Sequence, residues 1–219
     1  MLDLGGVLWL PHRGRIQERL AAAGITATRD EIARAHYCGV SAEDRASGTF
    51  EETLPHYLDG LLDGVGANPT QAATGKRLLL ENFRSQGAWS EPLSRSIEAL
   101  PLLAATGIRL GIVTNADGFA EDALREMGIC QVGPGKGVSV EVVIDSGAVG
   151  IRKPDPRIFE LALHAMEVTA AEAAYVGDSV RKDVEGAASA GLRPIHFDPF
   201  DLCSSSTHQH VHELADLLR

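Results

Sequence analysis

The chain has few aromatic residues and few cysteines for its 219 residues. Only 5% of the residues are aromatic, so alanine, leucine, valine and isoleucine must fill most of the core. The three cysteines, Cys38, Cys130 and Cys203, are far apart and show neither metal-ligand spacing nor a disulfide framework. We therefore expect free thiols, which are typical of a reducing cytosol.

Long apolar runs and an excess of positive charge are also missing. No segment approaches the roughly 18 consecutive apolar residues of a membrane span, and no signal peptide is visible. The formal net charge of −10 argues against nucleic acids and anionic membranes as partners. A small anionic substrate is compatible with this charge, because one site can hold a metal ion or a local positive charge. We expect a cytoplasmic protein, and the composition leaves its oligomeric state open.

The second half of the sequence alternates between short apolar runs and helical patterns. The predicted strands are Ile108–Val113, Val140–Ile144, Ala173–Val176 and Pro194–Phe197. The predicted helices between them are about Phe119–Met127, a helix capped by Asp155 with Pro156 at its first position, and Val180–Ala190. This alternation predicts an α/β fold with a parallel sheet.

The stretch from about His12 to Ala88 has no convincing strand pattern. Capping boxes at Thr28-x-x-Glu31 and Thr49-x-x-Glu52, with apolar residues at helical spacing, predict an inserted helical bundle. Residues 1–11 and 89–219 would then form the α/β core, and residues 12–88 the helical domain. Near the end of the chain we expect a helix over Val211–Leu218. The alternating His208-x-His210-x-His212 before it is expected to be an exposed polar tail, with a metal site as the alternative.

Polar residues follow the predicted strands or precede a helix at four places: Asp3, Thr114-Asn115, Lys153, and Asp178 with Asp183. The carboxyl ends of parallel strands share one edge, so these residues can converge there. Only two residues precede Asp3, fewer than the roughly five or six of an ordinary strand. The first strand is therefore unusually short, or the start of the sequence is truncated or misassigned.

These residue types suit phosphoryl transfer through an aspartyl intermediate, in which Asp3 attacks phosphorus. The Thr114 hydroxyl and nearby backbone amides, such as that of Leu4, would hold the phosphoryl oxygens, with Asn115 beside them. Lys153 would neutralise both Asp3 and the phosphate. Asp178 would bind a divalent cation, with Asp183 beside it or in the layer behind. Three carboxylates against one lysine require a further positive charge, and an oxygen-only ligand set points to Mg²⁺.

The ordered set of segments Asp3–Leu8, Val113–Asn115, Gly150–Phe159 and Val176–Ala187 resembles the haloacid dehalogenase superfamily of hydrolases. The resemblance implies a Rossmann-like core, a mobile α-helical cap formed by residues 12–88, and usually a Mg²⁺-dependent phosphatase. It also implies that the backbone carbonyl of residue 5 is a metal ligand, a role that Gly5 retains. The expected activity is removal of phosphate from a small phosphorylated metabolite.

Gly5 departs from the phosphatase pattern of that superfamily, which usually has an aspartate there as general acid and base. A positioned acid contributes about 10²–10⁴-fold to a rate. The enzyme is then slow, or its substrate has a good leaving group, or another residue supplies the acid, with His12, Arg13 and Asp117 as candidates. Two alternatives stay open: a metal-independent 2-haloacid dehalogenase-like hydrolase, and a non-catalytic phosphate-binding protein.

Overall fold

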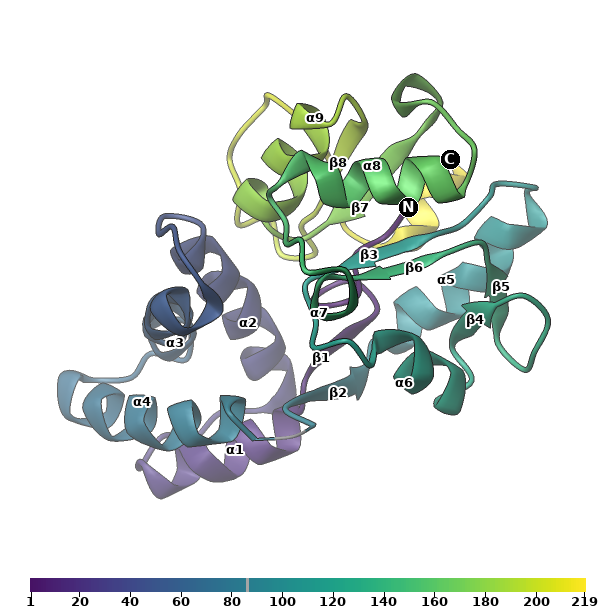
Figure 1. Ribbon diagram of the computed structural model, residues 1–219. Helices are drawn as coiled ribbons and strands as arrows, with labels where there is room; N and C mark the ends of the chain where they lie inside the picture. Colours follow the sequence, from purple (N-terminus) through teal and green to yellow (C-terminus); the bar gives the residue numbers. More distant parts are fainter. Residues whose placement is uncertain (86) are drawn as a thin grey trace. The chain divides into compact units, whose positions relative to one another are not determined.

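The computed structural model describes residues 1–85 and 87–219, which form two compact units (Figure 1). The α/β unit consists of Met1–Leu8, Leu93–Pro199 and Ser205–Arg219. The helical unit consists of Trp9–Pro92 and Phe200–Ser204. Gln86, which falls within the expected helical domain, lies outside the described residues. Every helix of the described residues is too short or too polar to cross a membrane.

A parallel sheet forms the centre of the α/β unit and confirms the predicted fold class. Strand β6 (Val143–Asp145) pairs with β3 (Ile112–Thr114), while β7 (Ala174–Gly177), β8 (Arg193–Phe197) and β9 (Gln209–Val211) pair in that order. Leu2 makes parallel bridges to both Ile112 and Val176. The N-terminal segment therefore lies between β3 and β7, and its carboxyl end shares an edge with theirs (Figure 1).

Short helices connect and cover these strands. They are α5 (Ser94–Ala105), α6 (Ala120–Glu126), α7 (Ser146–Val149), α8 (Pro156–Ala165) and α9 (Gly186–Ser189). Helix α8 begins as predicted, since the Asp155 side chain accepts a hydrogen bond from the Arg157 amide and Pro156 occupies the first turn. Its apolar face buries Ile158 and Phe159 against residues of β3, β6 and β7. Strands β4 (Cys130–Val132) and β5 (Val138–Val140) pair with each other.

The helical unit is built from α1 (Arg13–Ala22), α2 (Arg29–Glu43), α3 (Phe50–Gly64) and α4 (Pro69–Phe83). The capping boxes predicted at Thr28 and Thr49 are confirmed. Helices α2 and α3 pack closely because Gly60 has no side chain: a Cβ there would lie 2.5 Å from the Cys38 carbonyl oxygen. Strands β1 (Trp9–Pro11) and β2 (Trp89–Pro92) pair antiparallel at the ends of this unit. Whether the unit acts as a cap stays a prediction.

Four of the predicted elements were wrong in detail. The strand expected over Ile108–Val113 begins only at Ile112, as β3. The strand expected over Val140–Ile144 is interrupted, with β5 ending at Val140 and β6 starting at Val143. The helix expected over Val180–Ala190 is a π-helix over Val180–Glu185 followed by the short α9. The final helix expected over Val211–Leu218 is instead β9 followed by a 3₁₀-helix over Leu214–Leu218, because Val211 pairs with Phe197 of β8.

Candidate active site

The sheet presents Asp3 at its carboxyl edge. The Asp3 amide donates to the Val176 carbonyl at 2.8 Å, and the Leu2 carbonyl accepts from the Val113 amide at 3.0 Å, so neighbouring strands hold this segment from both sides. Beyond Asp3 the chain turns through Gly6, whose φ is +70°. A Cβ at Gly6 would lie 1.8 Å from Oδ2 of Asp178, so both the backbone angle and the space require glycine here.

Lys153 is buried beside Asp3, and its position is fixed by three hydrogen bonds. Its Nζ donates to Oδ1 of Asp3 at 2.8 Å, to Oδ1 of Asp183 at 2.7 Å and to the Tyr175 hydroxyl at 2.9 Å. The Tyr175 hydroxyl in turn donates to the Val113 carbonyl at 2.6 Å. Each of the three ammonium protons therefore has an acceptor, and the positive charge lies between two carboxylates.

Asp178 and Asp183 complete a buried group of three carboxylates with Asp3. One side-chain oxygen from each lies within 4.8 Å of the others. Asp183 is oriented by the Ser179 amide, which donates to its Oδ2 at 2.9 Å. A Cβ at residue 177 would lie 2.3 Å from the Asp183 carboxyl carbon, which explains Gly177. A buried set of oxygen donors with excess negative charge fits a hard divalent cation such as Mg²⁺.

The protonation of Asp3 reflects this crowding. Burial raises the pKa of the Asp3 carboxyl to about 7; Lys153 opposes this shift, and the charges of Asp183 and Asp178 add to it. Burial by itself would lower the pKa of Lys153, but Asp183 and Asp3 outweigh it and the pKa is raised. Lys153 is thus positively charged at neutral pH. The Asp3 carboxyl titrates near neutral pH, so binding of a cation beside it would favour loss of its proton.

The residues at the end of β3 have different environments. Thr114, at the carboxyl end of β3, is buried. Asn115 binds the backbone of Lys153 at both ends of its amide: Oδ1 accepts from the Lys153 amide at 2.8 Å, and Nδ2 donates to the Lys153 carbonyl at 3.0 Å. Asn115 therefore positions Lys153 in this structure, and its expected contact with phosphate stays a prediction.

Two buried polar residues of the site were not predicted. Tyr175 lies within a predicted strand, so its sequence position indicated only core packing. Asp145 ends β6 and accepts hydrogen bonds from the amides of Gly118 and Ala120 at 2.9 and 3.1 Å, which fixes the loop that follows β3. Asp145 stands at the end of a strand and caps the short helix α7. An aspartate in that position was the one feature of the sequence that could have indicated its role.

The candidates for the missing acid at Gly5 have separate environments. In the helical unit, the His12 side chain caps α1, and Arg13 forms an ion pair with Glu91 at 2.7 Å. In the α/β unit, Asp117 is exposed in the loop after β3. The assignment of any of them as the acid stays a prediction.

Sequence and structure comparisons agree with this geometry. The model of the haloacid dehalogenase-like hydrolase family matches residues 1–191. The chain belongs to this family. A phosphoserine phosphatase of Thermus thermophilus is 35% identical over 178 residues, which cover 81% of this chain and 66% of that protein. The chain therefore spans slightly less than two thirds of the length of this curated relative.

Solved structures of the haloacid dehalogenase-like fold cover nearly the whole chain. The magnesium-bound putative hydrolase YfnB of Bacillus subtilis is 19% identical, with a TM-score of 0.59, and the match covers 99% of this chain and 94% of that one. A 2-haloacid dehalogenase of Pseudomonas syringae is 21% identical, with a TM-score of 0.53 and the same coverage. Proteins with different activities thus share this fold, and the side chains of the site must distinguish their reactions.

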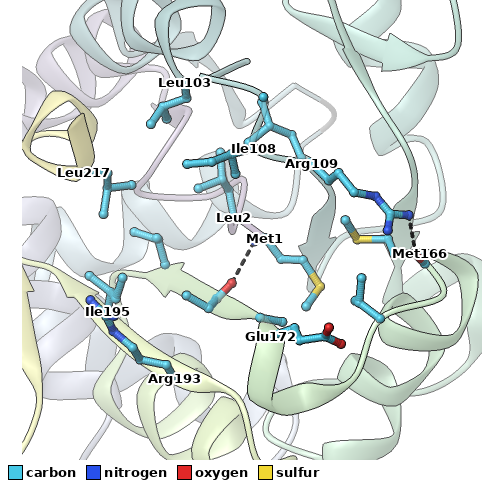
Figure 2. Close-up of a pocket in the computed structure, with 16 residues that line it drawn as sticks. Met1, Leu2, Leu103, Ile108, Arg109, Met166, Glu172, Arg193, Ile195 and Leu217 are labelled. Carbon is cyan, nitrogen blue, oxygen red and sulfur yellow. Dashed lines mark hydrogen bonds between the residues drawn. The ribbon is translucent and has the colours of Figure 1, made fainter. Parts of the chain in front are cut away.

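A pocket of about 500 Å³ lies elsewhere in the α/β unit (Figure 2). Its lining includes Met1, Ala174 and Arg193, which stand at the amino-terminal ends of their strands. The N-terminal ammonium group donates to the Ala174 carbonyl at 2.8 Å. The pocket therefore belongs to the sheet edge opposite the carboxylates and does not mark the candidate active site.

Proposed function

We propose that this protein is a Mg²⁺-dependent phosphatase that hydrolyses a small phosphate monoester through a phosphorylated Asp3. The observation that carries the proposal is the buried ion-pair network in which Lys153 joins Asp3 and Asp183 at 2.8 and 2.7 Å, with Asp178 beside them. The phosphatase names among the family relatives support the same class of reaction.

In the proposed mechanism, the ionised Oδ of Asp3 attacks phosphorus and the bond to the leaving oxygen breaks. Lys153 and the buried Thr114 hydroxyl stabilise the negative charge on the phosphoryl oxygens, together with the backbone amide of Leu4. Water then attacks phosphorus, the bond between the Asp3 oxygen and phosphorus breaks, and the protons of the water pass to phosphate and solvent, which leaves inorganic phosphate and the Asp3 carboxylate. Bound Mg²⁺ would supply further positive charge, held by Asp3, Asp178 and the Gly5 carbonyl, with Asp183 behind them.

With glycine at position 5, this mechanism lacks the side chain that usually donates a proton to the leaving group. The proposal therefore favours substrates whose leaving group needs little protonation, or a slow reaction. We also propose that the helical unit acts as the cap that contributes substrate selectivity. Hydrogen exchange measured with and without inorganic phosphate and Mg²⁺ tests this role, and unchanged exchange throughout residues 9–92 would contradict it.

The carboxylate group separates this proposal from metal-independent dehalogenation. A dehalogenase-type reaction at carbon needs the Asp3 nucleophile but no cation. Three ionised carboxylates beside one lysine carry an excess negative charge that a bound cation would balance, which supports the metal-dependent reaction. Phosphate release from p-nitrophenyl phosphate, phosphoserine and other small phosphate esters tests the choice, with Mg²⁺ or with EDTA. We expect release that needs Mg²⁺, is abolished in Asp3→Asn and persists in Asp122→Asn, which changes an exposed carboxyl of α6.

A different outcome would redirect the assignment. Halide release from 2-haloacids that continues in EDTA would establish the dehalogenase reaction instead. Binding of phosphate and Mg²⁺ without turnover of any ester would indicate a non-catalytic phosphate-binding protein.

A further inference from the structure

Three histidines gather on the strands β8 and β9 of the α/β unit. His196 of β8 pairs in register with His210 of β9, and His208 precedes His210 by two residues. His208 lies immediately before β9, and its ring stacks on that of His210 with an angle of 13° between the ring planes. The ring centroids of the three lie 4.6 to 5.2 Å from one another. The cluster is therefore built by the sheet.

The hydrogen bonds of His196 leave one ring nitrogen as an electron-pair donor. Its Nε2 lies 3.1 Å from the Asp178 carbonyl oxygen, which can only accept, so Nε2 carries the proton. In the neutral ring, Nδ1 then presents a lone pair, which accepts a hydrogen bond from Nε2 of His208 at 3.2 Å. A backbone carbonyl that fixes the tautomer is the usual support of a metal-binding histidine.

His210 is prepared in the same way. Its Nε2 lies 2.9 Å from the Ser205 carbonyl oxygen, so Nδ1 carries the lone pair. That nitrogen lies 3.4 Å from Oδ2 of Asp198, which is buried. A lone pair facing a carboxylate oxygen is unfavourable unless a proton or another cation lies near both.

The spacing of these atoms matches a metal site. With metal–nitrogen bonds of about 2.0–2.1 Å, two nitrogens of a tetrahedral site lie about 3.3–3.4 Å apart. The 3.2 Å between His196 Nδ1 and His208 Nε2 is close to that separation. His196 is buried, while His208 and His210 are half-buried, which leaves a route from solvent.

We propose that His196, His208 and His210 bind a divalent transition-metal ion of the Zn²⁺ class, with Asp198 beside His210. Imidazole donors select such an ion, whereas the oxygen donors around Asp3 select Mg²⁺. The ion would hold β9 against β8 across the long connection between them. His196 also contacts the Asp178 carbonyl, so the bound ion would order the loop that carries Asp178.

The experiment uses the full chain without an affinity tag, freed of metal and then saturated with Mg²⁺ so that the carboxylate site is occupied. Calorimetric titration with Zn²⁺ is expected to show one ion per chain, and Co²⁺ is expected to give the visible absorption of a tetrahedral complex. Removing a residue that only hydrogen-bonds to a metal ligand lowers metal affinity by about 10–100-fold, and removing a ligand itself lowers it at least as much. The double variant His208→Gln/His210→Gln should therefore bind Zn²⁺ at least about 100-fold more weakly.

Two controls locate the effect. His164→Gln changes an exposed histidine of α8, and Asp3→Asn changes the carboxylate site; both should bind Zn²⁺ as the unaltered protein does. Absence of Zn²⁺ binding in the presence of Mg²⁺, or equal affinity in the double variant, would overturn the proposal. If the double variant does not fold, imidazole nitrogen resonances of the unaltered protein decide. Zn²⁺ should shift those of His196, His208 and His210, and unshifted signals would overturn the proposal.

Discussion

Replacing Lys153 by methionine tests the electrostatics of the candidate active site. Methionine keeps much of the aliphatic length of the side chain but removes the charge and three hydrogen bonds, to Asp3, Asp183 and Tyr175. Removing one partner of a buried ion pair costs about 3–5 kcal/mol, because the remaining charge is left without compensation. With about 2–4 °C per kcal/mol for a chain of this size, the midpoint of thermal unfolding should fall by about 6–20 °C.

The loss should depend on pH, because the carboxylates left behind can take up protons. Lys153 lowers the pKa of Asp3 in the unaltered protein, where burial already raises it to about 7. Without the lysine this pKa rises further. In the unfolded chain the same carboxyl is ionised above about pH 4, so the free energy cost of folding with it protonated or buried as a charge grows as the pH rises. We therefore expect Lys153→Met to be more destabilising at pH 8 than at pH 5.

Thermal and urea unfolding of the metal-free proteins at both pH values measure this difference. Lys136→Met, which changes an exposed lysine, is the matched control and should change stability by less than about 0.5 kcal/mol. A Lys153→Met protein as stable as the control at pH 8 would refute the argument that this lysine compensates buried carboxylates.

Three further predictions concern the same sheet edge. Because the pKa of Asp3 is about 7 before metal binds, the apparent Mg²⁺ affinity should fall by about tenfold per pH unit below 7; a titration that is flat from pH 5 to 8 would contradict this. Gly6→Ala, which adds a Cβ 1.8 Å from Oδ2 of Asp178 at a φ of +70°, should destabilise by at least about 1–2 kcal/mol and weaken Mg²⁺ binding, as measured by urea unfolding and calorimetry. The φ of Gly5 lies outside the positive range that favours glycine, so the backbone is compatible with Gly5→Asp. This variant should raise kcat by about 10²–10⁴-fold on esters with poor leaving groups, because it restores a general acid. Equal rates for both proteins would show that acid catalysis is not limiting.

The convergence of the candidate site was predictable because it follows from topology. Asp3, Thr114 and Asp178 each follow a strand, and strands of a parallel sheet end at a common edge. Lys153 was predictable from its place beside the N-cap of a helix that returns over the same sheet. The sequence therefore contained the types and the order of the residues that the structure brings together.

The supporting contacts were not predictable, because they depend on side-chain packing between distant strands. Tyr175 fits the apolar pattern of a core strand, so the sequence does not distinguish it from other core residues. Only the fold brings its hydroxyl to Lys153. The π-helix over Val180–Glu185 has the apolar pattern of an α-helix, so the pattern could not reveal it. β9 is too short for an alternating apolar pattern to reveal it among polar residues. Its pairing with β8 brings the histidines close together.

The central claim is that Asp3 carries the phosphoryl group during hydrolysis. Acid quenching of the protein during turnover of a p-nitrophenyl ester with radiolabelled phosphate tests it most directly, followed by mapping of the label. We predict a hydroxylamine-sensitive label on the peptide that contains Asp3, dependent on Mg²⁺ and absent from Asp3→Asn. Steady Mg²⁺-dependent phosphate release by the Asp3→Asn protein, without any label on that peptide, would contradict the account.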